Sequence, residues 1–327
     1  MSRFFAGAAT LAFTAAFSFP SHANDSQAET ALGGLTLKHS DSIRMDSEDL
    51  YVSRDRVRVT YRFTNTSDRP IETLVAFPLP DIPPDYLDNK VFWSSLDDLK
   101  FKTTVDGKPL VHEIVQQAFF NGKDVTARLS ALKIPLNYRD QSFAEALKKT
   151  PKPERDKLIA EGLLRDDSTQ DAQFYTALWS LRTSVTRMQT FPANASVVVE
   201  HEYVPLLGGS VGGGLSASAR KNDYFKNEQR KYCIDKEWLA SFDKRMQKTG
   251  NRDIYGEIWL GYVLTTGANW KGPIGDFRLV IDKGKPDTLV SFCAEGVKKI
   301  SPTQFEVRHK DFTPKKDLDI LIVQWPQ

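Results

Sequence analysis

The chain has 327 residues, of which 44 are basic and 42 acidic, giving a formal net charge of +2. Binding to nucleic-acid phosphates normally needs clustered Lys and Arg, and the most basic stretch, 220–231, is interrupted by acidic residues. The composition therefore excludes a nucleic-acid partner and is typical of a globular protein.

The N-terminus resembles an export signal. Arg3 is followed by an uncharged, largely apolar run from Phe4 to Phe19, and small residues stand at Ser21 and Ala23. This pattern predicts a signal peptide of residues 1–23 and a mature start at Asn24. A membrane anchor is the alternative, but the run is shorter than the roughly 20 residues that cross a bilayer, and no comparable run follows it. We expect a periplasmic or secreted protein with no transmembrane segment after signal removal.

Alternating polarity predicts β-strands in the first part of the mature chain. Apolar and polar side chains alternate over 57–63, turn residues follow at 65–68, and an extended pattern resumes over 71–77. We interpret these segments as an antiparallel hairpin. A second hairpin is predicted around Asp106-Gly107, which separates two strand-like runs within 101–115.

Helical patterns interrupt the strands near 124–167. Ser142 and Glu145 form a capping-box pattern, and Pro153 suits the first turn of a helix. Strand character returns at 177–185 and 197–203. We expect a helical insertion in a sheet.

Five glycines in 208–214 predict a loop that separates an N-terminal β-sandwich half, 24–207, from a C-terminal half, 215–327. The second half is predicted to contain one helix over 235–248 and strands at 258–265, 276–281, 289–293, 304–308 and 318–323. The predicted fold class is mainly β, an antiparallel β-sandwich-like architecture with a helical insertion and a second β-rich half.

The mature chain has two cysteines, Cys233 and Cys293. An oxidising compartment allows such a pair to form a disulfide, which we predict. Two buried free thiols are the alternative.

Several separated motifs resemble an exported bacterial family catalogued as domain of unknown function 4424. They are found at Asn24-Asp25-Ser26, Gly33-Gly34-Leu35, Glu48-Asp49-Leu50-Tyr51, Ala76-Phe77-Pro78-Leu79-Pro80, Lys102 to Gly107 and Thr266 to Ile274. The resemblance covers nearly the whole mature chain. It implies secretion and a common fold, and it brings no activity.

No catalytic or metal-binding spacing emerges. The four histidines of the mature chain are widely separated, without a closely spaced ligand pair, and no EF-hand loop is found. We expect no cofactor, no metal site and no catalytic residues that can be named.

Aromatic residues near one predicted turn give the only specific indication of a ligand site. Trp259, Tyr262, Asn269 and Trp270 flank Thr265-Thr266-Gly267 and would form a contact platform if they were exposed together. The alternative is that Trp259 and Trp270 belong to the core, because large aromatic side chains dominate buried surfaces.

The leading functional prediction is a non-enzymatic binding or scaffolding protein of the bacterial envelope, with an unknown envelope protein or glycan as its partner. The alternative prediction is a hydrolase of envelope carbohydrate or peptide, with carboxylates brought together from distant loops.

Overall fold

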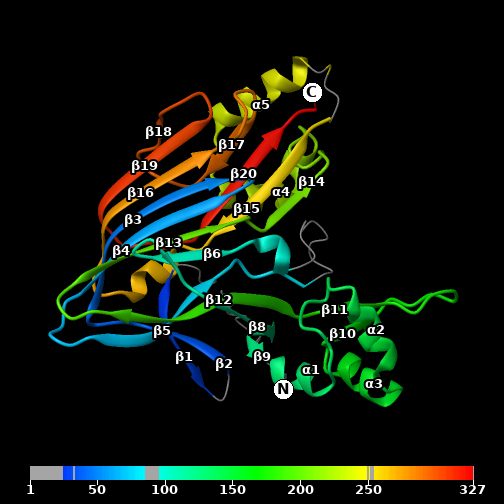
Figure 1. Cartoon of the computed structure of the whole chain (residues 1–327). Coiled ribbons are helices and arrows are strands. Elements are labelled where there is room, and N and C mark those ends of the chain that lie inside the picture. The colour runs from blue at the N-terminus through cyan, green and yellow to red at the C-terminus, as the bar shows by residue number, and fades with distance from the viewer. Residues whose placement is uncertain (1–24, 32–33, 85–95, 249, 251–253, 327) are drawn as a thin grey trace, which may run out of the picture.

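The computed structural model of the chain describes residues 25–31, 34–84, 96–248, 250 and 254–326 (Figure 1). The predicted signal peptide, 1–23, and the predicted mature start at Asn24 lie outside these residues. Strands predominate over helices, which confirms the mainly β, largely antiparallel fold class.

An eight-stranded sheet forms the centre of the molecule. Its spatial order is β18 (Lys298–Lys299), β19 (Gln304–Phe312), β16 (Ile274–Asp282), β3 (Ile43–Ser53), β4 (Val57–Asn65), β13 (Ser196–Tyr203), β6 (Lys102–Val105) and β7 (Lys108–Pro109). The alternation predicted over 57–63 is confirmed, because Val57, Val59, Tyr61 and Phe63 are buried and Arg58 and Arg62 are exposed.

The two sides of the glycine-rich stretch share this sheet. β3 pairs in parallel with β16, while the other paired strands among the described residues are antiparallel. The glycine-rich stretch also begins as β14 (Leu207–Ser210) rather than as a loop. The segments 24–207 and 215–327 are therefore not structurally independent, because backbone hydrogen bonds between β3 and β16 join them.

A six-stranded sheet packs against the first one. Its order is β2 (Gly34–Lys38), β1 (Ser26–Ala31), β5 (Ile71–Pro78), β12 (Ser180–Phe191), β8 (Glu113–Phe120) and β9 (Lys123–Asp124). The hairpin predicted over 57–77 is wrong, because β4 and β5 belong to different sheets. The side-chain amide of Asn65 donates to the carbonyls of Arg69 and Phe191, and so holds the connection as a crossing between sheets.

The second predicted hairpin, within 101–115, is confirmed only around its turn, because residues 113–115 belong to β8 in the six-stranded sheet. β6 and β7 pair around Asp106 and Gly107, which both have positive φ, as a type I′ turn requires.

A four-stranded sheet completes the sandwich. Its order is β14, β15 (Gly256–Tyr262), β20 (Leu318–Gln324) and β17 (Leu289–Phe292). Its inner face contributes Ile258, Leu260, Ile320 and Ile322 to a hydrophobic core shared with the two larger sheets. Two helices, α4 (Asp223–Tyr232) and α5 (Lys236–Lys248), pack on its outer face. The sequence predicts only α5 of these two helices, because charged residues separate the few apolar positions of α4.

The helical insertion is confirmed. It contains α1 (Thr126–Ala131), α2 (Ser142–Lys149), α3 (Lys152–Ala160) and the short hairpin β10 (Leu164–Asp166) and β11 (Tyr175–Ala177). It has its own hydrophobic cluster around Trp179 and lies at the lower right of Figure 1, away from α5. Among the described residues, three short 3-10 helices lie in connections: η1 (Leu96–Leu99), η2 (Ala219–Lys221) and η3 (Thr265–Asn269). Within the described part of the chain, no helix has the length and apolar character that crossing a membrane requires.

Candidate binding groove

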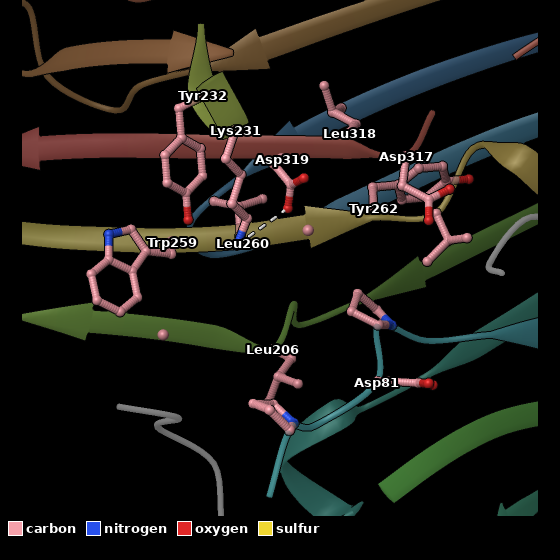
Figure 2. A pocket seen from close by; sticks show the side chains of 15 residues that line it. Asp81, Leu206, Lys231, Tyr232, Trp259, Leu260, Tyr262, Asp317, Leu318 and Asp319 are labelled. Atoms are coloured by element: carbon pink, nitrogen blue, oxygen red, sulfur yellow. Dashed lines mark ion pairs between the residues drawn. The ribbon is translucent and has the colours of Figure 1, made fainter. Parts of the chain in front are cut away.

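A groove of about 310 Å³ opens on the outer face of the four-stranded sheet (Figure 2). Trp259 stands opposite Gly208 on β14 and opposite Leu321 on β20, and Gly261 stands opposite Asp319. Cross-strand partners share one face of a sheet. Leu321 packs among the residues beneath α4 and α5, so this is the outer face. The groove lies where the helices leave that face uncovered.

Two segments from elsewhere in the chain form the walls. The end of α4 contributes Lys231 and Tyr232, and the segment after β5 contributes Pro80, Asp81 and Pro83. The latter segment is fixed to β12, because the backbones of Ile82 and Leu181 exchange two hydrogen bonds of 2.8 Å. The complete lining is Pro80, Asp81, Pro83, Leu206, Gly208, Lys231, Tyr232, Trp259, Leu260, Gly261, Tyr262, Val263, Asp317, Leu318 and Asp319.

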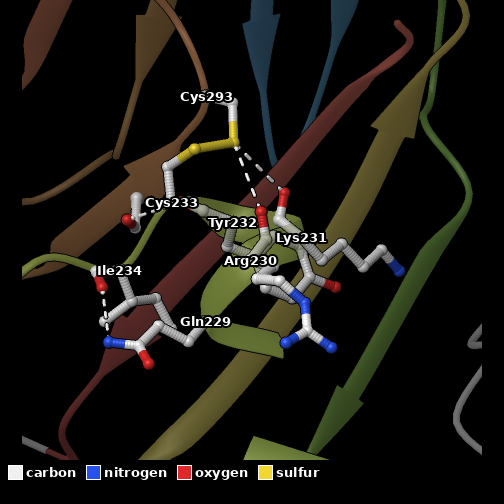
Figure 3. Close-up of a disulfide and its surroundings, with 8 residues drawn as sticks. Gln229, Arg230, Lys231, Tyr232, Cys233, Ile234 and Cys293 are labelled. Atoms are coloured by element: carbon white, nitrogen blue, oxygen red, sulfur yellow. Dashed lines mark hydrogen bonds between the residues drawn. A yellow bond between two sulfur atoms is a disulfide. The ribbon is translucent and has the colours of Figure 1, made fainter. Parts of the chain in front are cut away.

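The disulfide predicted between Cys233 and Cys293 is confirmed, and it holds the α4 wall (Figure 3). Cys233 ends α4 in a left-handed conformation with φ 52°, and Cys293 directly follows β17. The Cys293 sulfur lies 3.5 Å from the carbonyl oxygen of Lys231. The covalent link therefore ties the helix end that carries Lys231 to the four-stranded sheet.

The charged groups of the groove are engaged with partners. Lys231 Nζ lies 3.7 Å from the Asp319 carboxylate, and Arg182 donates to both oxygens of Asp81 at 3.1 and 2.9 Å. Asp317 accepts hydrogen bonds from the backbone N–H and the hydroxyl of Thr265, at 3.1 and 2.7 Å. These contacts hold the carboxylates of Asp81, Asp317 and Asp319 in place in the groove that Trp259 also lines.

Burial raises the pKa of both Asp317 and Asp319 above the ordinary value of 3.8. Hydrogen bonds from Thr265 oppose this rise at Asp317, and the Lys231 ammonium opposes it at Asp319. The two carboxyl groups are thus partly desolvated but remain held by donors.

Two of the four predicted ligand-contact residues line the groove. Trp259 is half-buried, and its indole lies along the groove floor in Figure 2. Tyr262 also lines it, but its hydroxyl is buried against the hydroxyl of Tyr61 at 2.8 Å and the Glu48 carboxylate at 3.3 Å. Burial raises the pKa of Tyr262 well above 10. Its contact with a ligand stays a prediction.

The other two predicted residues lie away from the groove. Trp270 is 0% exposed, packs against Phe63 and Phe191, and donates its indole N–H to the carbonyl of Asp25 at 2.6 Å. The side-chain amide of Asn269 donates to the Ser26 hydroxyl at 3.0 Å. The four residues therefore form no single platform: Trp270 belongs to the core, and Trp259 remains accessible.

A buried polar cluster, Asp25, Arg187 and His201, was not predicted. Arg187 donates to both carboxylate oxygens of Asp25 at 3.1 and 2.6 Å, and His201 Nε2 lies 3.2 Å from the same oxygens. His201 Nδ1 lies 3.0 Å from the hydroxyl of Thr103. An acid, an imidazole and a hydroxyl in series are typical of nucleophilic catalysis. Here all of them are buried, so the cluster anchors β1 and has no access for a substrate.

The other polar groove residues were also missed. Asp317 and Asp319 flank a buried Leu318 at the start of β20, a period-two signal that could have placed both carboxylates on the face opposite to Leu318. Lys231 and Asp81 carry no comparable local signal, because they reach the groove from α4 and from the segment after β5.

Comparison with known proteins places the chain in a family. No curated protein matches it. A solved structure of a protein described as a "putative nutrient binding protein" from Legionella pneumophila subsp. pneumophila str. Philadelphia 1 is similar in fold, with 13% identity, a TM-score of 0.45, and coverage of 92% of this chain and 70% of that chain. That likeness is too weak to carry an argument about ligands. Residues 23–321 match a family model described as "Domain of unknown function (DUF4424)", and the chain therefore belongs to this family.

Proposed function

We propose that the protein is a non-enzymatic binding protein of the bacterial envelope and that the groove beside Trp259 is its ligand site. The observation that carries the proposal is a half-buried indole on the floor of a groove whose charged groups already have partners. Binding pockets typically combine an apolar or aromatic surface with a few fixed polar groups. The fixed carboxylates and Lys231 supply orientation, and the indole supplies contact area.

Export is part of this proposal. The apolar run 4–19 and the small residues at 21 and 23 support a cleaved leader, and the disulfide suits an oxidising compartment. Cell fractionation with N-terminal sequencing should find the protein outside the cytoplasm with Asn24 as its first residue. Recovery from the cytosol with residue 1 intact would contradict export.

Binding can be tested by native mass spectrometry of the mature protein after incubation with a soluble envelope extract. We expect bound compounds whose retention falls about tenfold or more in Trp259→Ala, since loss of an aromatic contact worth about 1.4 kcal/mol changes affinity tenfold. Trp238→Ala is the matched control. Trp238 is similarly half-buried, but it donates its indole N–H to Val290 outside the groove. Equal loss in both variants, or no retained compound, would contradict the proposal.

One observation favours the alternative of a hydrolase. The raised pKa values of Asp317 and Asp319 bring these carboxyl groups closer to the protonated state that a general acid needs. A hydrolase should release products from labelled envelope glycan or peptide and should lose that activity in Asp317→Asn or Asp319→Asn. Binding without product release supports the non-enzymatic proposal instead.

A further inference from the structure

We infer that the groove beside Trp259 binds a neutral sugar ring, as one residue of a glycan; this inference rests on the proposed function and specifies its ligand class. Three features of the described residues lead to it. They are a glycine beside the indole, a neighbouring pair of opposite charges, and an excess of carboxylates.

The first feature is the space next to Trp259. Its cross-strand partner on the same face is Gly208, so β14 itself contributes no side chain at this register position. Leu206, which Figure 2 labels, and Pro83 also line the groove. At this position the groove floor is the backbone of Gly208 next to one aromatic ring. A flat ring with an apolar C–H face fits such a floor, because it can pack against the indole and a glycine adds no Cβ between the ring and the β14 backbone.

The second feature is the pair of Lys231 and Asp319, which are 3.7 Å apart. Both side chains are partly exposed, at 47% and 39%, so both remain accessible to a ligand. An ammonium group only donates hydrogen bonds and a carboxylate only accepts them, whereas a hydroxyl does both. Neighbouring hydroxyls of one sugar ring can therefore accept from Lys231 and donate to Asp319 at the same time.

The third feature, the set of carboxylates, disfavours charged ligands. Asp81, Asp317 and Asp319 line the groove, which disfavours an anion. A cation would have to compete with Lys231 for Asp319, and like charges repel over this distance. Since Asp81 is also paired with Arg182, the groove offers hydrogen-bonding groups more than net charge. A neutral polyhydroxylated ligand satisfies these conditions.

The test is isothermal titration calorimetry of the mature protein with uncharged trisaccharides, namely tri-N-acetylchitotriose, maltotriose and cellotriose. Trilysine and trigalacturonate serve as cationic and anionic probes. We expect at least one neutral trisaccharide to bind at least tenfold more tightly than either charged probe, with an affinity that changes little between low and high salt. Tighter binding of a charged probe would overturn the inference.

Substitution of Gly208 locates the site without removing any contact group. Gly208→Val should reduce trisaccharide affinity at least tenfold, because the added side chain stands on the groove floor beside Trp259. Ser210→Val is the matched control. It adds the same side chain on the same face of β14, and Ser210 does not line the groove. Unchanged affinity in Gly208→Val, with the variant folded by circular dichroism, would overturn the assigned site.

The two proposals fail in different ways. If envelope compounds depend on Trp259 but none of the trisaccharides binds, the ligand class is wrong and the binding function stands. If neither envelope compounds nor trisaccharides depend on Trp259, both proposals are wrong.

Discussion

Trp259 and Trp270 illustrate how one residue type has two structural roles. Trp270 is fully buried among Phe63 and Phe191, and its indole N–H holds the backbone of Asp25. Trp259 lies half-buried on the floor of the groove. Their neighbouring sequence does not distinguish these roles, because burial depends on which sheet face each side chain meets.

Trp270→Ala should lower the free energy of unfolding by about 3 to 5 kcal/mol, since it removes a large core side chain and leaves a cavity. Trp259→Ala should cost clearly less, because the indole already contacts solvent. Urea unfolding followed by circular dichroism measures both values. Similar losses in the two variants would show that Trp259 is also a core residue.

His201 should make stability depend on pH. Burial lowers its pKa below the ordinary value of 6.5, although Asp25 opposes the shift. Below about pH 6.5 the unfolded chain therefore binds a proton that the folded protein does not, and unfolding becomes easier as pH falls. The stability that neutral His201 contributes is therefore complete above pH 6.5, and it decreases as the pH falls toward the lowered pKa of His201. Asp25 does not share this window, because its pKa lies well below 3.8.

Urea unfolding at pH values from 7.5 to 5 tests this dependence. The wild-type free energy of unfolding should fall over this range, and His201→Gln should flatten the slope even if it lowers the absolute value. Partial burial and Arg187 also lower the pKa of His112. His112→Gln is therefore the control that measures how much of the pH slope comes from this second histidine. A slope in His201→Gln equal to that of the wild type would rule out His201 as the source.

At the scale of elements, the sequence predicts where strands lie better than it predicts which strands pair. Side-chain alternation predicts β4, because burial of one face imposes a period of two. The inward side chains of β15 and β20 are likewise apolar. The same alternation carries no information on pairing. The hairpin predicted from 57–63 and 71–77 is therefore wrong, because the two strands lie in different sheets. α4 was missed because its few buried side chains, Phe225 and Tyr232, are separated by charged residues.

The disulfide between Cys233 and Cys293 affects both the stability of the fold and the position of the α4 wall of the groove. Cys233 and Cys293 are 60 residues apart in the chain. Replacing both by Ser removes this cross-link and should lower the free energy of unfolding by up to about 4 kcal/mol. It should also weaken ligand retention in the groove, because the end of α4 that carries Lys231 loses its covalent tie to the sheet. Thermal melting and the binding assay check the two effects. An unchanged melting temperature would contradict a stabilising role.

At the scale of the whole molecule, the parallel pairing of β3 with β16 joins distant parts of the chain. Seven residue pairs from Asp276↔Ser47 to Asp282↔Ser53 form this contact, and the shared core includes side chains from before and after the glycine-rich stretch. The predicted boundary at 208–214 is therefore a connection within one folded unit.

Limited proteolysis near Val211, which is 96% exposed, tests this unity. Cleavage there should produce two fragments on a denaturing gel that still elute together in size-exclusion chromatography. Both cysteines lie on the C-terminal side, so the disulfide cannot join the fragments and association must come from the sheet and core. Fragments that separate under native conditions would show two independent halves.

The sequence by itself determined the mainly β class, the helical insertion and the cysteine pair, because periodicity, capping patterns and residue counts are local properties. Only the tertiary structure decided that Trp270 is core, that Asp25 meets Arg187 and His201, and that Lys231, Trp259 and Asp319 surround one groove. These contacts join residues far apart in the chain, and their positions depend on strand pairing between sheets, which local side-chain patterns do not encode.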